Sequence, residues 1–501
     1  MSAEYSQVRT EDGDAFDLRE IIIAGDGDDE RTIDIDEYIR SCEEEKQQQQ
    51  QQQHHTSSNI RNKASAPISR PPSKHRDRIF AAAFGLHLVL LGVLSASIED
   101  GTSMRSSLTS YGRNGSWSQI LMIMTLLGAF SGAIITFFVN NAEMRDGFLK
   151  LCLVFSIVLQ LLVGNVLLIM KSRYSPLGAV ALLSALHNML KYRMVSDSIH
   201  LTSTLLHMVI EVCGHYGFVL TVACVLILAL QTCVLLWWGA CFVGILSGTP
   251  ESTAWVLLLV LFASLSWITQ FFRCLVSYVI GGCVVWYFVR DEAEPLDPGK
   301  RVLLHLQCAL STSLGSLCKG ALLSQTYMLV LSLEHWGRGR PGSVSGRFSL
   351  RRLVQGLVAP VAGSARRHHR LALCLTATYG KTLCTAAGDY AERYPETIAL
   401  AIEDLTGYSL GAASTCVSGL LALLSTVLVD NSLTADATES WPLLFAVNFY
   451  VAFSGMALVT CTYRGAVDAL VVVFAEEPLR LAKENQIIFL RFLRQTERAL
   501  Q

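Results

Sequence analysis

Long stretches of the chain contain no charged residue, and they constrain the fold more than any other feature. Residues 117–140, 151–170 and 212–250 carry no Asp, Glu, Lys or Arg, and residues 253–289 carry only Arg273. The hydrocarbon core of a bilayer is about 30 Å thick and needs about 20 apolar residues for one helical crossing. A core helix of a soluble protein can be equally apolar, but not repeatedly at this length. The pattern therefore predicts an all-α polytopic membrane protein.

Hydropathy and loop charge together order the first six crossings. The expected spans, the fourth being weaker, cover about residues 79–98, 117–140, 148–170, 177–190, a part of 215–246, and 253–289. Residues 194–211 have an amphipathic pattern, which predicts a helix in the membrane interface. Lys and Arg gather in the loops that this order leaves on the cytoplasmic side, as the positive-inside rule requires. Asn114, in the first outer loop, begins a short glycosylation pattern.

The segment after Arg301 does not follow the charge rule. If residues 302–333 crossed the bilayer once, the arginine-rich stretch 338–370 would lie outside the cell. The polar run at 311–316 favours a broken or re-entrant helix, which is tolerated where protein or a water-filled cavity surrounds it. A second crossing at residues 371–385 is the alternative. We expect about ten transmembrane helices, and the re-entrant alternative concerns one or two of them.

The two ends of the chain are polar. Residues 1–78 carry sixteen acidic residues within the first 46 positions and then a glutamine tract. Such a segment buries too little apolar area to order itself, so we expect a disordered tail, and the basic residues before the first span place it in the cytoplasm. The expected organisation is a helical transmembrane domain at 79–480 with its last spans at 406–429 and 443–474, a basic cytoplasmic loop at 338–370, and a cytoplasmic C-terminal helix at 481–501.

The sequence lacks the motifs of common catalytic and ATP-driven classes. There is no GxxxxGK[ST] nucleotide-binding loop, and no HExxH or GxSxG pattern stands out. We therefore expect no enzymatic activity, no cofactor, no metal ion and no nucleic-acid partner. Passive or ion-coupled transport is the default function for a chain with many spans and a polar stripe inside the membrane.

Arg273 is the most informative residue, because a charge inside a membrane is costly and usually faces protein or water. At 100° per residue, Trp267, Gln270 and Tyr278 fall on one side of the sixth span, and Arg273 lies at the edge of the same stripe. We expect this face to line a cavity rather than to meet lipid.

Two roles are open for the charged residues. In the first, Arg273 pairs with an acidic residue of a later span and fixes helix packing. In the second, the same network borders a permeation path and changes partners during transport. The residues expected in this network, besides Arg273, are Lys319, Glu403, Asp404 and Asp468.

Aromatic residues provide a second set of candidates. Trp237, Trp267, Tyr278 and Tyr408 could form an aromatic wall for a quaternary ammonium ion through cation–π attraction. Trp and Tyr also mark the two membrane interfaces, which is the competing explanation.

Four short elements of the C-terminal half, in this order along the chain, resemble the choline transporter-like family. The elements are Trp267-Ile268-Thr269-Gln270 with Arg273 and Gly281-Gly282, Ser313-Leu314-Gly315-Ser316 with Lys319 and Gly320, Ala377-Thr378-Tyr379-Gly380-Lys381, and Val467-Asp468-Ala469 with Phe474-Ala475-Glu476-Glu477-Pro478. The second element departs from the family at Ala321, where Ser is usual, and the fourth at Glu477, where Asp is usual.

The resemblance implies about ten membrane helices, cytoplasmic termini and a place in the plasma membrane. Members of the family move choline, and some move ethanolamine or thiamine pyrophosphate. We therefore expect transport of choline or a related organic cation, by a facilitator or secondary transporter surrounded by membrane lipids. One alternative is a transporter of thiamine pyrophosphate or another anionic solute, in which Arg273 and Lys319 contact phosphate. The other is a non-transporting membrane scaffold, whose tail and basic loop recruit protein partners of unknown kind.

Overall fold

The structure, a computed structural model, divides the chain into two units that are described separately. Their bounds are Met1–Ala66 with Ala482–Glu484, and Pro67–Leu481 with Asn485–Gln501. The residues that the structure describes are 8–9, 15–16, 20–23, 31–34, 76–100, 116–169, 175–197, 199–248, 251–289, 297–323, 369, 371–394, 405–430, 441–490 and 492–493.

The first unit contains two short antiparallel hairpins within the segment predicted to be disordered. Strand β1 (Val8–Arg9) pairs with β2 (Ala15–Phe16), and β3 (Glu20–Ile23) pairs with β4 (Arg31–Asp34). A lone two-stranded hairpin is marginally stable in water. The described residues of the tail therefore show short local structure.

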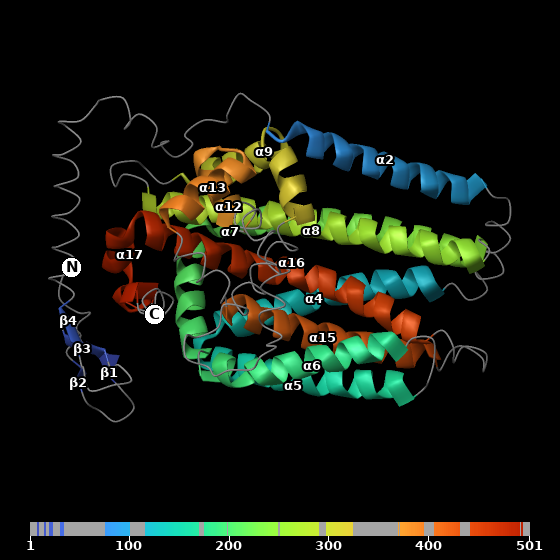
Figure 1. Ribbon diagram of the computed structural model, residues 1–501, viewed down its shortest axis with the longest axis horizontal. Coiled ribbons are helices and arrows are strands. Elements are labelled where there is room, and N and C mark those ends of the chain that lie inside the picture. The colour runs from blue at the N-terminus through green and yellow to red at the C-terminus, as the bar shows by residue number, and fades with distance from the viewer. Residues whose placement is uncertain are drawn as a thin grey trace, which may run out of the picture. The chain divides into compact units, whose positions relative to one another are not determined.

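Long apolar helices build the second unit (Figure 1). They are α2 (Arg78–Asp100), α4 (Ser116–Asn140), α5 (Ala142–Ile169), α6 (Ser175–Asp197), α7 (Ile199–Gly248), α8 (Glu251–Val289), α15 (Leu405–Asp430) and α16 (Trp441–Glu476). Within the described residues, six helices are long and apolar enough to cross a membrane, and they belong to α2, α5, α7, α8, α15 and α16. Helices α4 and α6 lie where the second and fourth spans were predicted. The all-α polytopic class is thus confirmed.

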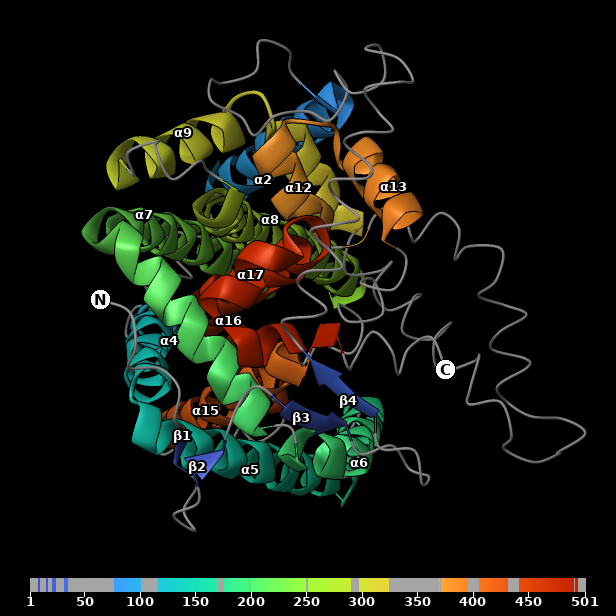
Figure 2. The ribbon, with the colours of Figure 1, turned by 90° about the vertical axis from the view of Figure 1, so that its left-hand side faces the viewer.

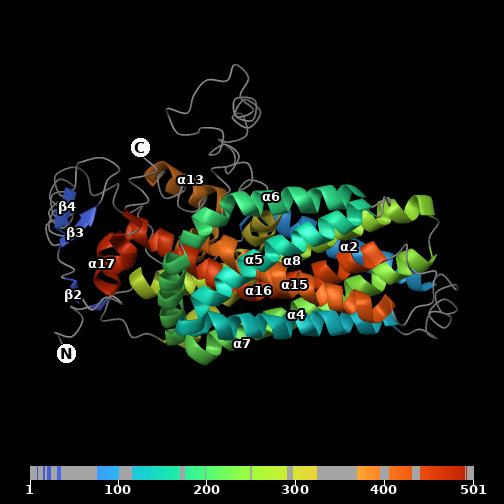
Figure 3. The same cartoon turned by 90° about the horizontal axis from the view of Figure 1, so that it is seen from below.

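Helix α16 lies at the centre of this unit. It packs against α4, α7, α8, α12 (Leu371–Tyr379) and α15, and 78% of its most apolar window is buried, against 11% for α2. Figure 3 shows α5 and α6 side by side, and α15 packs against both of them as well as against α16. A Cβ atom at Gly465 would lie 2.9 Å from Ser277 Cα, so the absent side chain lets α16 approach the α8 backbone closely.

Helix α7 contains a break at Gly217. This glycine has φ 45° and ψ −127°, a combination that side chains other than hydrogen rarely permit. The part of α7 before the break runs across the ends of the other helices (Figures 1 and 2). The predicted interface helix at residues 194–211 is divided between the end of α6 and the part of α7 before the break, and its position in the interface stays a prediction.

The chain after α8 is built from short helices. Helix α9 (Pro298–Leu310) starts at the cap residue Asp297, whose side chain accepts a hydrogen bond from the Lys300 amide at 3.1 Å. It ends at a turn over residues 311–313, and the helix Leu314–Leu323 follows. The predicted break at the polar run 311–316 is therefore present. Whether the segment returns to the same side depends on residues 324–368, which lie outside the described part, as does most of the basic loop 338–370.

A continuous crossing at residues 371–385 is not what the structure shows. Helix α12 has only nine residues, about 14 Å at 1.5 Å per residue, and α13 (Leu383–Arg393) begins after a break at residues 380–382. Thr382 caps α13 by accepting a hydrogen bond from the Thr385 amide. The described residues 371–385 therefore do not form one continuous helix, and a crossing at this place stays a prediction.

The predicted C-terminal helix is also interrupted. Helix α17 covers Pro478–Glu484, and a separate helical segment covers residues 486–490. The Asn485 side chain accepts a hydrogen bond from the Ile488 amide at 3.1 Å, which caps the second segment.

Candidate substrate cavity

A polar cavity of about 280 Å³ lies between α8, α12, α15 and α16. The polar and charged side chains among its described lining residues are Gln270, Arg273, Ser277, Ser414, Thr460, Arg464 and Asp468, with the thiols of Cys274, Cys374 and Cys461. Such a concentration of polar groups inside apolar spans is expected only where they face protein or water.

Helical spacing on α8 and α16 places these residues on facing surfaces. Gln270, Arg273 and Ser277 recur every three or four residues along α8, and Arg464 and Asp468 are one turn apart on α16. The two helices are joined at the cavity wall, where Ser277 Oγ lies 3.0 Å from Cys461 Sγ. The same thiol donates to the backbone oxygen of Arg273 at 3.5 Å.

The Arg273 guanidinium is weakly held. Its Nη1 atom is 3.5 Å from Gln270 Oε1, at the limit of a hydrogen bond, and its Nε atom has no hydrogen-bond partner among the described residues. Its central carbon lies 5.4 Å from the centre of the Phe453 ring, within cation–π range. Phe453 lines the same cavity. The arrangement shows an aromatic face that already receives a cation.

Asp468 supplies the negative charge. Asp468 is 5% exposed, and among the described residues that line the cavity it is the one carboxylate, beside two residues with guanidinium groups, Arg273 and Arg464. Glu403 and Asp404, which were predicted for the same network, lie outside the described residues. The structure thus brings together three predicted residues, Gln270, Arg273 and Asp468.

The predicted aromatic residues do not line this cavity. Trp267 donates from Nε1 to the Cys318 backbone oxygen at 3.2 Å and stacks on His87 with the ring centres 5.0 Å apart. Tyr278 is fully buried, with its hydroxyl 3.1 Å from Ser313 Oγ.

The other two predicted aromatic residues also connect helices. Trp237 donates to Ser95 Oγ of α2 at 3.2 Å, and Tyr408 donates to Asn188 Oδ1 of α6 at 2.6 Å. Lys319 is likewise separate from the Arg273 network, because its Nζ atom contacts Asp77 and Cys384. Asn114 lies outside the described residues.

The sequence reasoning missed several cavity residues, among them one aromatic and one charged residue of α16. Phe453 and Arg464 belong to a stripe on α16 that continues through Ala457 and Cys461 to Asp468 at intervals of three or four residues. Arg464 could have been identified from the sequence, because it is a second charged residue in this span and lies one helical turn before Asp468.

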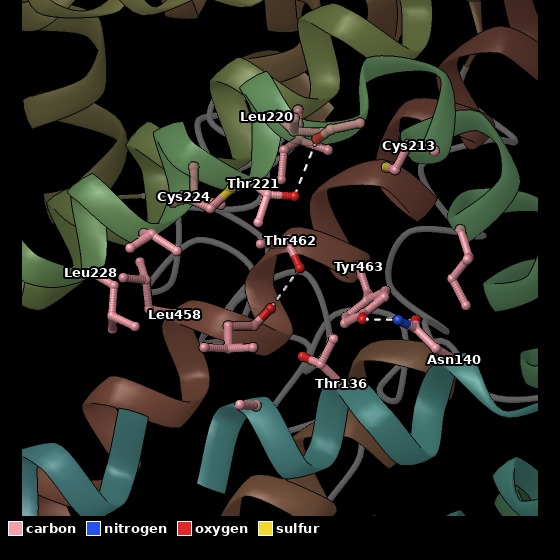
Figure 4. A pocket seen from close by; sticks show the side chains of 18 residues that line it. Thr136, Asn140, Cys213, Leu220, Thr221, Cys224, Leu228, Leu458, Thr462 and Tyr463 are labelled. Atoms are coloured by element: carbon pink, nitrogen blue, oxygen red, sulfur yellow. Dashed lines mark hydrogen bonds between the residues drawn. The ribbon is translucent and has the colours of Figure 1, made fainter. Parts of the chain in front are cut away.

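A second, larger cavity of about 520 Å³ lies on the other side of the α8–α16 pair, between these helices, α4 and α7 (Figure 4). Among its described lining residues there is no Asp, Glu, Lys or Arg. Its polar groups include Tyr463, which donates to Asn140 Oδ1 at 3.2 Å, and Thr221, which donates to the Gly217 backbone oxygen at 3.1 Å. It offers no counter-charge to an ion, so we place the candidate site in the smaller cavity.

Two further elements of the family resemblance meet at one end of the bundle. The Tyr379 hydroxyl donates to Glu476 Oε2, which connects α12 with the end of α16. Lys381 forms an ion pair with Asp389 at 2.7 Å. Burial and the neighbouring Glu476 raise the pKa of the Tyr379 hydroxyl, so it stays protonated and able to donate.

Comparison with known families agrees with the resemblance. The family described as plasma-membrane choline transporter matches residues 179–479, which is more than half of the chain. The chain belongs to the plasma-membrane choline transporter family. The match includes every helix that lines the smaller cavity. It makes this chain an integral membrane protein of a family that transports choline-type substrates. A search of curated proteins finds no match.

Proposed function

We propose that the chain carries choline or a related organic cation across the membrane, as a facilitator or secondary transporter, and that the cavity of Arg273 and Asp468 binds the substrate. The observation that carries the proposal is that one buried cavity combines a carboxylate, Asp468, with an aromatic face, Phe453. A carboxylate neutralises an ammonium charge, and an aromatic face attracts its methyl groups. The proposal includes a plasma-membrane location with both termini in the cytoplasm.

Arg273 acts in this proposal as an internal substitute for the substrate. Its guanidinium occupies the Phe453 face, and it is held otherwise by one long hydrogen bond. An entering ammonium ion would take over the ring and share Asp468, while the guanidinium turns toward Gln270. The guanidinium and the ammonium ion thus compete for the same aromatic face and carboxylate. Such an exchange of partners would couple substrate binding to a rearrangement of the site.

A second candidate, transport of an anionic solute such as thiamine pyrophosphate, is favoured by the two guanidinium groups that face one carboxylate among the described lining residues. Arg273 and Arg464 would bind phosphate in this case, since guanidinium matches its oxygens. Lys319 lies in a separate cluster and would not take part.

Uptake by the full chain in proteoliposomes tests the proposal. Labelled choline is offered with an excess of unlabelled choline, ethanolamine or thiamine pyrophosphate. We expect choline and ethanolamine to compete, and Asp468→Asn to reduce uptake at least about tenfold, which corresponds to about 1.4 kcal/mol, because the variant removes the carboxylate charge that the proposal assigns to the ammonium ion.

Asp389→Asn is the matched control, since its ion pair with Lys381 is partly exposed and contributes little. Uptake of labelled thiamine pyrophosphate, measured in the same proteoliposomes, without uptake of labelled choline would favour the anionic candidate. Uptake of none of these solutes by a folded protein would favour the scaffold.

A further inference from the structure

Two residues immediately before α2 are bound to the turn and helix that follow α9. The Arg76 amide donates to the Thr312 backbone oxygen at 2.9 Å, and its Nη1 atom donates to Ser313 Oγ at 3.3 Å. Burial lowers the pKa of this guanidinium, although it remains charged at neutral pH. Arg76 is thus held by both backbone and side chain.

Asp77 completes the contact. Its Oδ2 atom accepts a hydrogen bond from Ser316 Oγ at 2.6 Å, and its Oδ1 atom lies 3.4 Å from Lys319 Nζ. The side chains of Lys319 and Asp77 are only 13% and 15% exposed, so this ion pair is shielded from water. Asp77 also has φ 48°, in the left-handed region that non-glycine residues rarely adopt and that persists only where the surroundings hold it.

Gly315 makes the approach of the two segments possible. A Cβ atom at this position would lie 2.2 Å from the Asp77 backbone oxygen and 2.4 Å from the Arg76 backbone oxygen. Both neighbours are backbone atoms, so no rotation of a side chain could relieve the clash. Any larger residue must push residues 76–77 away.

The contact reaches the candidate cavity through the helix Leu314–Leu323. Lys319 Nζ also donates to Cys384 Sγ of α13 at 2.9 Å, and a Cβ at Gly320 would lie 3.3 Å from Leu373, a residue of the cavity wall. The same helix therefore touches the start of α2, the start of α13 and the α12 residue beside the substrate.

Helix α2 is the span best able to move. Only 11% of its apolar window is buried, and contacts of α2 side chains with the other helices include the ring cluster of Phe84 and His87 with Trp267 and the bond from Trp237 to Ser95. The Arg76–Asp77 contact fixes its remaining end.

We propose that residues 76–77 form a latch that, by binding segment 312–319, closes one end of the transporter, which the charge pattern places in the cytoplasm. The latch opens when the carboxylate of Asp77 leaves Ser316 and Lys319, so that α2 and the helix Leu314–Leu323 separate. Its part in turnover rests on the proposed transport function. The closure of the Lys319–Cys384 region by the latch does not depend on that function.

The half-buried Cys384 thiol reports on the latch directly. In full-length protein in proteoliposomes, the alkylation rate of Cys384 by N-ethylmaleimide is followed by peptide mass spectrometry. We expect Asp77→Asn to raise this rate about tenfold, the factor that corresponds to one charge-assisted hydrogen bond. Choline uptake should lose maximal rate while its KM stays the same, because the cytoplasmic end no longer closes.

Ser316→Ala is the milder second variant, which removes the 2.6 Å hydrogen bond without removing a charge, and it should act in the same direction. Asp297→Asn is the matched control, because Asp297 is exposed and pairs with Lys300 outside the latch. Unchanged Cys384 alkylation in a folded Asp77→Asn or Ser316→Ala protein would overturn the latch. Faster alkylation in a protein that takes up no choline would keep the latch and overturn the proposed function.

Discussion

The Arg273 guanidinium lies over the ring of Phe453, with 5.4 Å between its central carbon and the ring centre. The two residues come from α8 and α16, the pair that separates the two cavities. Because the ring lines the polar cavity, it is available to any cation that can displace the guanidinium. A test of the site should therefore begin with this ring.

Replacing Phe453 by Leu should raise the KM for choline by about fivefold with a smaller effect on maximal rate. Leucine keeps the apolar volume but removes the ring face, whose attraction for a cation amounts to about 1 kcal/mol. The measurement is the concentration dependence of labelled choline uptake in proteoliposomes. Phe445→Leu, two turns earlier on α16 and absent from the cavity wall, is the control and should keep the original KM. Equal KM values for Phe453→Leu and the original chain would remove the ring from the site.

The membrane spans and three polar residues of the cavity could be predicted from the sequence. Apolar length and charge-free runs locate α2, α5, α7, α8, α15 and α16 because the bilayer imposes one length on every crossing. Gln270, Arg273 and Asp468 could be identified because a polar group inside a span has few alternatives to a cavity.

The role of Trp267 and Tyr278 could not be derived in the same way. Periodicity tells which residues share a face, but α8 packs against α7, α9, α12 and α16, so more than one of its faces meets protein. Trp267 forms a hydrogen bond with the Cys318 backbone oxygen, and Tyr278 with the Ser313 hydroxyl. Both partners belong to the segment after α9, whose path could not be predicted from the sequence. Whether an aromatic side chain lines a cavity depends on which element packs against its helix face, and periodicity does not predict that element.

Gly465→Leu should destabilise the protein by about 1–3 kcal/mol. The side chain would be forced against the Ser277 backbone, since a Cβ alone would lie 2.9 Å from its Cα atom, and overpacking of a close helix contact has a cost of this size. Thermal unfolding in detergent is the measurement, with an expected drop in Tm. The control is Gly388→Ala in α13, where a Cβ meets nothing within 4 Å, and its Tm should stay or rise slightly. Equal Tm values for both variants would contradict the close α8–α16 packing.

Tyr379→Phe should lower stability by about 1–3 kcal/mol, because it removes the donor to Glu476 and leaves a shielded carboxyl group without that hydrogen bond. The loss should be largely recovered in the double variant Tyr379→Phe/Glu476→Leu, in which no polar atom is left behind. Tm values of the two single variants and the double variant form a complete cycle. Additive effects of the two substitutions would show that the residues do not interact.

His305 should make stability depend on pH between about 6.5 and 4. Its ring is 2% exposed, packs against Gly282 and has no hydrogen-bond partner among the described residues, so burial, with Arg301 nearby, lowers its pKa to about 4. As the pH falls below 6.5, the imidazole becomes protonated in the unfolded chain but stays neutral in the folded chain. The free energy of unfolding therefore decreases progressively until about pH 4, by an amount of the order of 3 kcal/mol. The Tm of His305→Leu should fall less over this range than that of the original chain, whereas His207→Leu, at an exposed position, controls for loss of a histidine. Parallel Tm profiles for the original chain and His305→Leu would show that this ring is not the group responsible.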